Sequence, residues 1–115
     1  MSFTPLASDF YGFATQLTDT ERTALAGLRS WLESEVKPVV NDYWDRAEFP
    51  HQLLPAFHQQ PVFGMQWDET KPFENSAVFR GWAALELSRI DASISTYVGV
   101  QNGLALGSVA VCGSA

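Results

Sequence analysis

The chain has 115 residues, of which 46% are hydrophobic and only 17% are charged, and its formal net charge is −6. Four Trp, eight Phe and three Tyr are more apolar material than a disordered chain contains, and the length suits one domain with a buried core. The acidic balance argues against nucleic acids and anionic membranes as partners, because both are bound through clusters of Lys and Arg.

The only cysteine, Cys112, cannot form an intramolecular disulfide or a thiolate zinc cage, and it suits a reducing compartment. Residues 1–9 lack the basic region and long apolar stretch of a secretory signal. We therefore expect a cytoplasmic protein. Cys112 follows Val109, Ala110 and Val111 with no histidine nearby, so we expect a buried structural thiol rather than a nucleophile.

Residues 1–16 are rich in aromatics without a helical period, and they predict a lead-in with one short helical turn around 9–14. A capping box then runs from Thr18 to Glu21, in which each of these residues can bond the backbone of the other, and it predicts the start of a helix. Pro38 predicts a kink or an end near 35–37, after which the apolar pattern resumes. In the part of this helix before Pro38, apolar residues recur at helical spacing: Leu25, Leu28, Leu32 and Val36.

Pro50 is a natural first-turn residue and predicts a second helix that continues to about Gln59. Residues 61–75 contain three breakers, Pro61, Gly64 and Pro72, and predict a loop. Its large apolar residues suggest that this loop packs down on the domain.

Asn75 or Ser76 can cap the next helix. Two neighbouring apolar stripes on it predict burial on two sides. One stripe is Val78, Trp82 and Leu85, and the other is Phe79, Ala83 and Ile90.

Asp91 interrupts this helix, Ser93 can cap a final helix over 94–112, and Gly113 can close it. The stretch after Asp91 carries no charge and is long enough to span a bilayer. Gln101 and Asn102 in its middle favour a buried helix of a soluble protein instead. The elements together predict an all-α, up-and-down bundle of four to five helices, with the last helix at its centre.

No complete catalytic set or metal site is found among these residues. His51 and His58 would lie two turns apart, which is too far for one metal ion, and no Glu-x-x-His pattern occurs. An acidic cluster beside Arg46 is typical of a solvated helix end; it consists of Asp42, Asp45 and Glu48.

Glycines recur every fourth position in the last predicted helix, at Gly99, Gly103 and Gly107. Such a stripe without side chains lets another helix pack closely, and it also gives a groove for a ligand. Spacing alone favours close helix packing.

The run Glu86-Leu87-Ser88-Arg89-Ile90-Asp91-Ala92-Ser93 resembles the N-terminal helical domain of the acyl-CoA dehydrogenase family, most closely its glutaryl-CoA dehydrogenase-like branch. The resemblance covers about 17–114. It continues in order and spacing with Trp44-Asp45-Arg46-Ala47-Glu48-Phe49-Pro50, Phe63-Gly64-Met65, Val100-Gln101 with Leu104, and Gly113-Ser114.

The resemblance implies that residues 17–115 are one helical domain of a longer flavoprotein oxidoreductase of fatty acid or amino acid catabolism. The enzyme would convert an acyl-CoA to the trans-2-enoyl-CoA, with FAD held mainly by later domains. The catalytic glutamate also lies there, so no catalytic residue is expected in this chain. Electron-transfer flavoprotein as acceptor and a homotetramer or homodimer are implied as well.

By this resemblance, one wall of the acyl pocket is formed by the last predicted helix through Ser95, Thr96, Gly99, Val100 and Leu104. Two departures matter. The family's Gly-Gly loop is replaced by residues 68–75, and Ser95 stands where glutaryl-type members have an arginine for a distal carboxylate, which favours a neutral acyl chain. The alternative is a non-catalytic helical module that packs on a partner protein through the glycine stripe.

Overall fold

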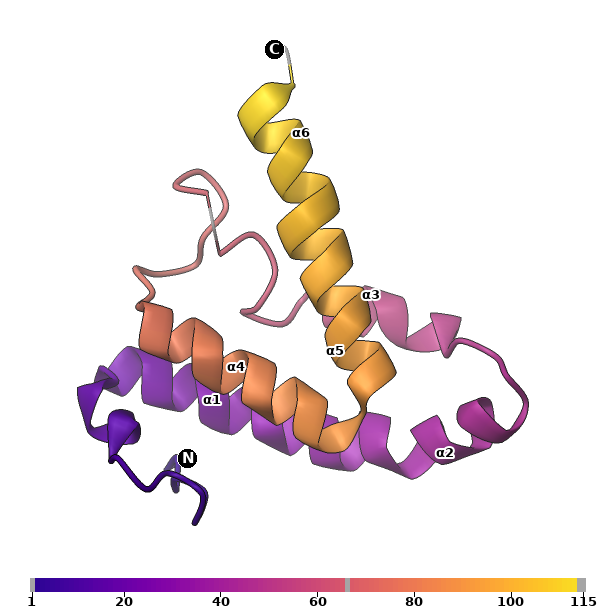
Figure 1. The fold of residues 1–115 in the computed structure, drawn as a ribbon, viewed down its shortest axis with the longest axis horizontal. Coiled ribbons are helices and arrows are strands. Elements are labelled where there is room, and N and C mark those ends of the chain that lie inside the picture. The colour runs from indigo at the N-terminus through magenta and orange to yellow at the C-terminus, as the bar shows by residue number, and fades with distance from the viewer. Residues whose placement is uncertain (1, 66, 114–115) are drawn as a thin grey trace.

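The computed structural model describes residues 2–65 and 67–113, and every regular element within these ranges is a helix (Figure 1). A first rod consists of α1 (Asp19–Trp31), the π-helical turn η2 (Leu32–Val36) and α2 (Lys37–Asp45). The helix α4 (Ala77–Ile90) packs along it. The all-α prediction is therefore confirmed.

Glu21 connects the beginnings of two helices. Its Oε2 accepts the N–H of Thr18 at 2.9 Å and the Thr18 hydroxyl accepts the N–H of Glu21, which confirms the capping box. Its Oε1 accepts the N–H of Ser76 at 2.6 Å, at the cap of α4. The residue is only 1% exposed, and its carboxylate thus satisfies donors at both helix starts.

We expect Glu21→Gln to lower the free energy of unfolding by about 1.5–3 kcal/mol at neutral pH, as is typical of hydrogen bonds to charged groups. Burial opposes the charged form of Glu21, but the hydrogen bonds from Thr18 and Ser76 outweigh it and lower the pKa below 4.5. A carboxyl group whose pKa is lower in the folded than in the unfolded state stabilises the fold at a pH above the unfolded-state pKa. This stabilisation is lost as the pH falls through the folded-state pKa. Urea melts should therefore show the difference from wild type shrinking below about pH 4.5, and a constant difference would contradict the role of the charge.

The predicted irregularity before Pro38 is a π-helical turn rather than an end. Proline cannot donate the N–H that an α-helix needs, and its ring clashes with the carbonyl four residues earlier. The helix widens over Leu32–Val36 and continues as α2 with Pro38 in its first turn. All four predicted apolar residues of this rod are buried, so its inward face was predicted correctly.

The second predicted helix, over 50–59, is shorter than expected. It consists of the 3-10 turn η3 (His51–Leu53) and one turn of α-helix, α3 (Leu54–Phe57). Pro55 lies in the first turn of α3, where its missing N–H is tolerated. The loop that follows packs on the domain as predicted, because Val62 and Met65 are both buried.

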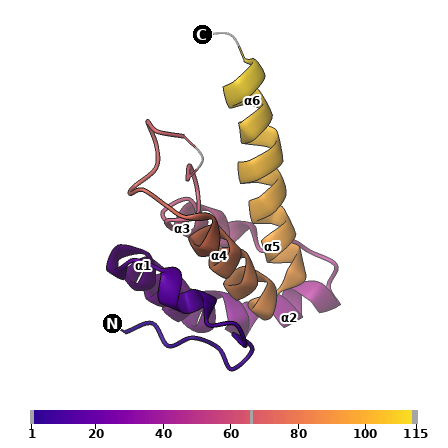
Figure 2. The same ribbon diagram turned by 60° about the vertical axis from the view of Figure 1, so that its left-hand side comes forward.

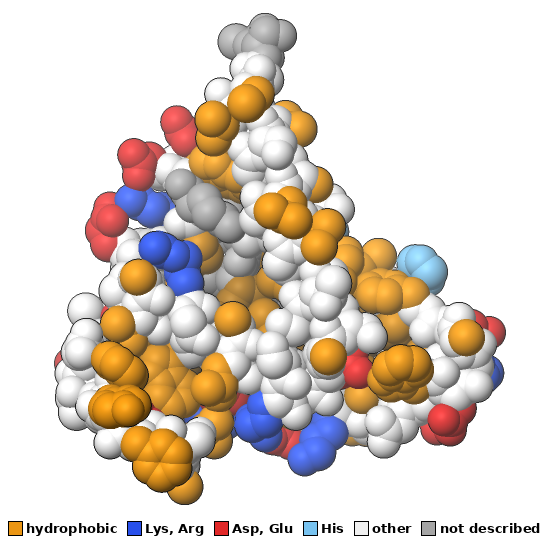
Figure 3. All heavy atoms as spheres, viewed as in Figure 1, with side chains coloured by type: hydrophobic (Ala, Val, Ile, Leu, Met, Phe, Trp, Pro, Cys, Tyr) orange, Lys and Arg blue, Asp and Glu red, His pale blue; other side chains and the backbone are white. Residues whose placement is uncertain are grey.

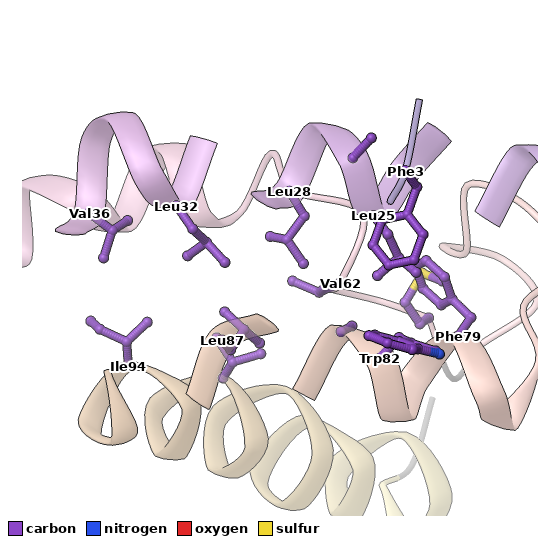
Figure 4. Packing of buried hydrophobic residues seen from close by; sticks show 14 of the residues in the cluster. Phe3, Leu25, Leu28, Leu32, Val36, Val62, Phe79, Trp82, Leu87 and Ile94 are labelled. Carbon is purple, nitrogen blue, oxygen red and sulfur yellow. The ribbon is translucent and has the colours of Figure 1, made fainter. Parts of the chain in front are cut away.

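The core lies between α1, η2 and α4. Leu25, Leu28 and Leu32 point toward Trp82 and Leu87, and Val62 of the loop lies among them (Figure 4). Burial of α4 on two sides is only partly right, because Leu85 is 39% exposed whereas Trp82 is 6% exposed.

The last rod, formed by α5 (Ala92–Val98), the π-helix η4 (Gly99–Ala105) and α6 (Leu106–Cys112), leaves the domain instead of filling its centre (Figures 1 and 2). Hydrophobic side chains are visible along it, and none of α6 is buried (Figure 3). The predicted central position is wrong, and so is the predicted burial of Cys112, which is exposed. A helix without charges indicates an apolar contact but not which partner provides it.

Asp91, not Ser93, caps this rod, since its Oδ1 accepts the N–H of Ile94 at 2.8 Å. Gly113 ends it as predicted. Among the described residues, no helix has the length and apolar character needed to cross a membrane.

The lead-in is packed onto the helices only in part: Phe3 and Ala14 are buried, whereas Phe10 and Tyr11 are 88% and 86% exposed. The 3-10 helix η1 (Phe13–Gln16) begins slightly later than the turn predicted around 9–14, and the Asp9 carboxylate accepts the N–H groups of its first two residues, Phe13 and Ala14. Phe3 is 6% exposed and its ring meets Trp82 edge-on.

Candidate functional site

A cavity of about 220 Å³ lies between α4 and the beginning of the last rod, with the loop around 62–65 at its side. The chain turns from α4 into α5 at Asp91, and the two helices diverge from this turn (Figure 1). Its walls are mainly apolar, and they include Val62, Met65, Phe79, Ala83 and Leu87.

Asn102 fixes the loop to η4 at this cavity. Its Nδ2 donates to the carbonyl of Val62 at 2.9 Å, and its Oδ1 accepts the N–H of Gly64 at 2.9 Å. Asn102 is 5% exposed, so both polar ends of a buried amide are satisfied.

Gly64 is required by the loop's own conformation. Its φ is +67°, and a Cβ placed there would lie 2.8 Å from the Thr70 hydroxyl. That hydroxyl donates to the carbonyl of Gly64 at 2.8 Å, which closes the loop on itself. The loop is thus held locally by Thr70 and across the cavity by Asn102.

Ser95 supplies the cavity with a hydroxyl, and Arg80 is the charged side chain among its lining residues. The Ser88 hydroxyl donates to Ser95 Oγ at 2.8 Å, where α4 and α5 come together. Arg80 donates to Asn75 Oδ1 at 2.6 Å. A mainly apolar cavity with few polar groups at its edges is the usual form of a small-molecule site.

The five residues predicted for the acyl wall lie on two faces of the last rod. Ser95 and Gly99 line the cavity. Thr96, Val100 and Leu104 lie on the outward face, with Val100 47% and Leu104 67% exposed. Thr96 donates its hydroxyl to the carbonyl of Ala92.

The glycine stripe does not pack against another helix within the described residues. A Cβ at Gly99, Gly103 or Gly107 would meet no atom of a neighbouring segment within 4 Å. Close helix packing inside this chain, favoured by the spacing, is therefore wrong. Gly99 and Gly103 both border the cavity, and they lie in the π-helix η4, a form of helix that often occurs at functional sites.

Asn102 is the residue that the sequence reasoning missed. In the sequence analysis, Asn102 was considered only as a polar residue that argues against a membrane-spanning helix. Gln101 beside it is also a carboxamide but is exposed, so no signal in the sequence distinguished Asn102, whose partners come from elsewhere in the fold.

The remaining polar candidates do not gather into a site within the described residues. His51 and His58 are both exposed, and His58 Nε2 lies 3.1 Å from the hydroxyl of Tyr97. Glu48 pairs with Arg46 at 3.0 Å, and Asp42 and Asp45 are exposed. Over residues 2–65 and 67–113, no group of three or more His, Cys, Asp or Glu side chains is arranged to hold a metal ion.

Most of the chain matches a known protein family. Residues 18–115 match the family model described as acyl-CoA dehydrogenase, N-terminal domain. The match includes α1, α4, the connecting loop and the whole last rod, and hence every residue that lines the cavity between α4 and the last rod.

Proposed function

The chain belongs to the acyl-CoA dehydrogenase family, whose N-terminal domain it provides, and from this premise we propose that it forms one wall of an acyl-binding site. The observation that supports this is the apolar cavity that is lined by Ser95 and Gly99 on one side and by α4 and the 62–65 loop on the other. Small residues on one side and aliphatic residues on the other suit an acyl chain, which needs apolar contact and few polar partners.

The whole enzyme would take an acyl-CoA and form the trans-2-enoyl-CoA, with FAD accepting the hydride. The cavity of about 220 Å³ is smaller than the roughly 300–1,000 Å³ typical of sites for drug-sized ligands, so it does not fit the complete dinucleotide. We therefore assign FAD mainly to later domains of the enzyme and give this chain no step of the flavin reaction. Its contribution is to bind and orient the acyl chain and to exclude water from it.

The outward face of the last rod is the second part of the proposed wall. Thr96, Val100 and Leu104 offer one hydroxyl and two apolar side chains there, and further out Val109 and Val111 are 68% and 82% exposed. We propose that later domains cover this face and enclose the acyl chain against it, since burying such apolar surface is favourable.

The substrate we favour has a neutral acyl chain. By the family resemblance, a distal carboxylate would need a cation at the position of Ser95, which presents a hydroxyl. Arg80, the charged residue that lines the cavity, is hydrogen-bonded to Asn75. The glutaryl-CoA dehydrogenase-like branch, electron-transfer flavoprotein as acceptor, and a homotetramer or homodimer are further parts of this proposal.

A second candidate function is a non-catalytic helical module. The exposed apolar residues of α6 and the open glycine stripe favour it, because both would suit a partner protein. Turnover of an acyl-CoA by the protein that carries these residues separates the two functions.

The test of the acyl wall is Gly99→Leu in the whole enzyme. The side chain meets no neighbouring segment of this chain within 4 Å of its Cβ, so the fold should tolerate it. We expect kcat/KM for long acyl-CoAs to fall about 5- to 150-fold, which corresponds to overpacking by about 1–3 kcal/mol, while short acyl-CoAs are spared.

Gly27→Leu is the matched control, because Gly27 is an exposed helical glycine that also has no neighbour within 4 Å of a Cβ. It gains the same helix propensity, about 0.8 kcal/mol, on α1 rather than at the cavity. An equal loss of kcat/KM at all chain lengths in Gly99→Leu, or the same pattern in Gly27→Leu, would remove Gly99 from the acyl wall.

A further inference from the structure

One wall of the acyl cavity is a loop that is held from both η4 and α4. Its side chains Val62 and Met65 are 6% and 4% exposed, and both line the cavity. From η4, Asn102 forms two hydrogen bonds with the loop backbone. From α4, Arg80 donates to Asn75 Oδ1 at 2.6 Å, and Asn75 Nδ2 donates to the carbonyl of Met65 at 2.8 Å. The position of this wall relative to the two helices thus depends on two carboxamides.

The two hydrogen bonds of Asn102 require opposite functions of its side chain. The N–H of Gly64 needs an acceptor and the carbonyl of Val62 needs a donor, and both bonds are 2.9 Å long. A carboxamide provides both, whereas a carboxylate only accepts. Asn102 is 5% exposed, so bulk water does not replace a bond that is lost there. A change that removes only the donor should therefore release the loop from η4.

The glycines of η4 leave the opposite wall without side chains. Gly99 and Gly103 both line the cavity, and a Cβ at either position would meet no neighbouring segment within 4 Å. The width of the cavity at this point is therefore set by how far the loop lies from η4. Asn102, which lies between the two glycines in the sequence, fixes that separation through its hydrogen bonds.

We propose that Asn102 is a positioning residue for acyl-chain selectivity. By holding Val62 and Met65 at a fixed separation from η4, it determines how much apolar contact a longer acyl chain makes in the cavity. It acts through this wall and takes no part in the reaction. The proposal rests on the acyl-binding function proposed above and adds the residue that shapes the site.

Asn102→Asp in the whole enzyme tests the role, because it keeps the size of the side chain but removes the donor to Val62. We expect KM for octanoyl-CoA to rise about four- to fifteenfold, which corresponds to the apolar contact of roughly one to two methylene groups. We expect kcat for octanoyl-CoA and both constants for butanoyl-CoA to stay within about twofold, since only uniform binding of the longer chain is lost.

Gln101→Glu is the matched control, because Gln101 is the neighbouring carboxamide of η4 but is exposed. It introduces the same negative charge one residue away without touching the loop bonds. We expect the ratio of the two KM values to stay at that of the wild type. An equal rise in Gln101→Glu would show repulsion of the anionic acyl-CoA by the added charge and would overturn the proposal.

Asn102→Ala removes both bonds without adding a charge and serves where Asn102→Asp does not fold. Thermal melts of each variant report the fold, and the KM ratio reports selectivity. If a folded variant has an unchanged ratio, or if KM and kcat change alike for both substrates, Asn102 is only structural and the proposal fails. Failure of both variants to fold would assign Asn102 to the fold itself and would also overturn its role in selectivity.

Gly99→Leu distinguishes failure of this proposal from failure of the acyl-binding function. If Gly99→Leu discriminates against long acyl-CoAs and the Asn102 variants do not, the acyl wall stands and only the role of Asn102 is lost. If neither residue affects long and short acyl-CoAs differently, the cavity does not hold the acyl chain, and both proposals fail.

Discussion

Glu86→Gln should destabilise the domain by about 3–5 kcal/mol, the cost typical of breaking a buried ion pair. Glu86 is 0% exposed, and its two oxygens accept from Arg29 of α1 at 2.6 and 3.1 Å. Arg89, one turn along α4, donates to the same carboxylate at 3.1 Å. A glutamine would keep the shape but would lose the charge and turn an amide N–H₂ toward two guanidinium groups.

The matched control is Glu33→Gln. Glu33 pairs with Arg89 at 2.7 Å and with Lys37 at 2.9 Å, but its side chain is 38% exposed. Exposed ion pairs contribute at most about 1 kcal/mol, so the two changes should differ severalfold in urea melts of the same chain. Equal small losses would mean that the Glu86 pairs do not hold α1 and α4 together.

A double change separates the charge from the packing. Arg29→Met leaves Glu86 buried with Arg89 as its remaining cation, and we expect it to be strongly destabilising too. Glu86→Leu combined with Arg29→Met removes both charges, and hydrophobic replacement of a buried pair is often neutral or stabilising. The double variant should therefore be more stable than either single loss of charge.

The features that could be predicted from the sequence are those set by residues within one or two helical turns. The capping box depends on Thr18 and Glu21 alone, and the buried face of the first rod depends on a repeat of leucines. The proline at 38 acts on the carbonyl four residues before it, so the irregularity could be placed although its π-helical form could not.

The features that could not be predicted depend on segments far apart in the chain. The second partner of Glu21 is the backbone of Ser76, and the partners of Asn102 are the backbones of Val62 and Gly64. No local pattern encodes such contacts. The exposed position of the last rod could not be predicted for the same reason. An uncharged helix has the same composition whether its own domain covers it or another segment does.

Some residues of the candidate site could be named from the sequence, and others only from the fold. Ser95 and Gly99 came from the resemblance around Glu86–Ser93 and do line a cavity, whereas Asn102 needed the fold to be recognised. The same resemblance assigned Thr96, Val100 and Leu104 to the wall. The helical rotation, which the spacing already contained, turns them outward.

Trp82→Ala should cost about 3–5 kcal/mol, as expected for truncation of a large core side chain. Trp82 is 6% exposed between α1 and α4, where Figure 4 shows it facing Leu25 and Phe3. Leu85→Ala, three residues along the same helix, is the matched control, because Leu85 is 39% exposed and its loss should cost well under half as much.

Phe3 extends this test to the lead-in. Its ring meets Trp82 edge-on, with the centroids 5.4 Å apart, and the guanidinium of Arg29 lies 4.5 Å from the same ring. Such an aromatic pair contributes about 0.5–1.5 kcal/mol beyond the area that it buries. A double-mutant cycle of Phe3→Ala and Trp82→Ala should measure a coupling of this size. If the coupling is zero but Trp82→Ala lowers the free energy of unfolding strongly, the tryptophan packs as described and the lead-in does not. If Trp82→Ala and Leu85→Ala lower it equally little, the orientation of α4 itself is contradicted.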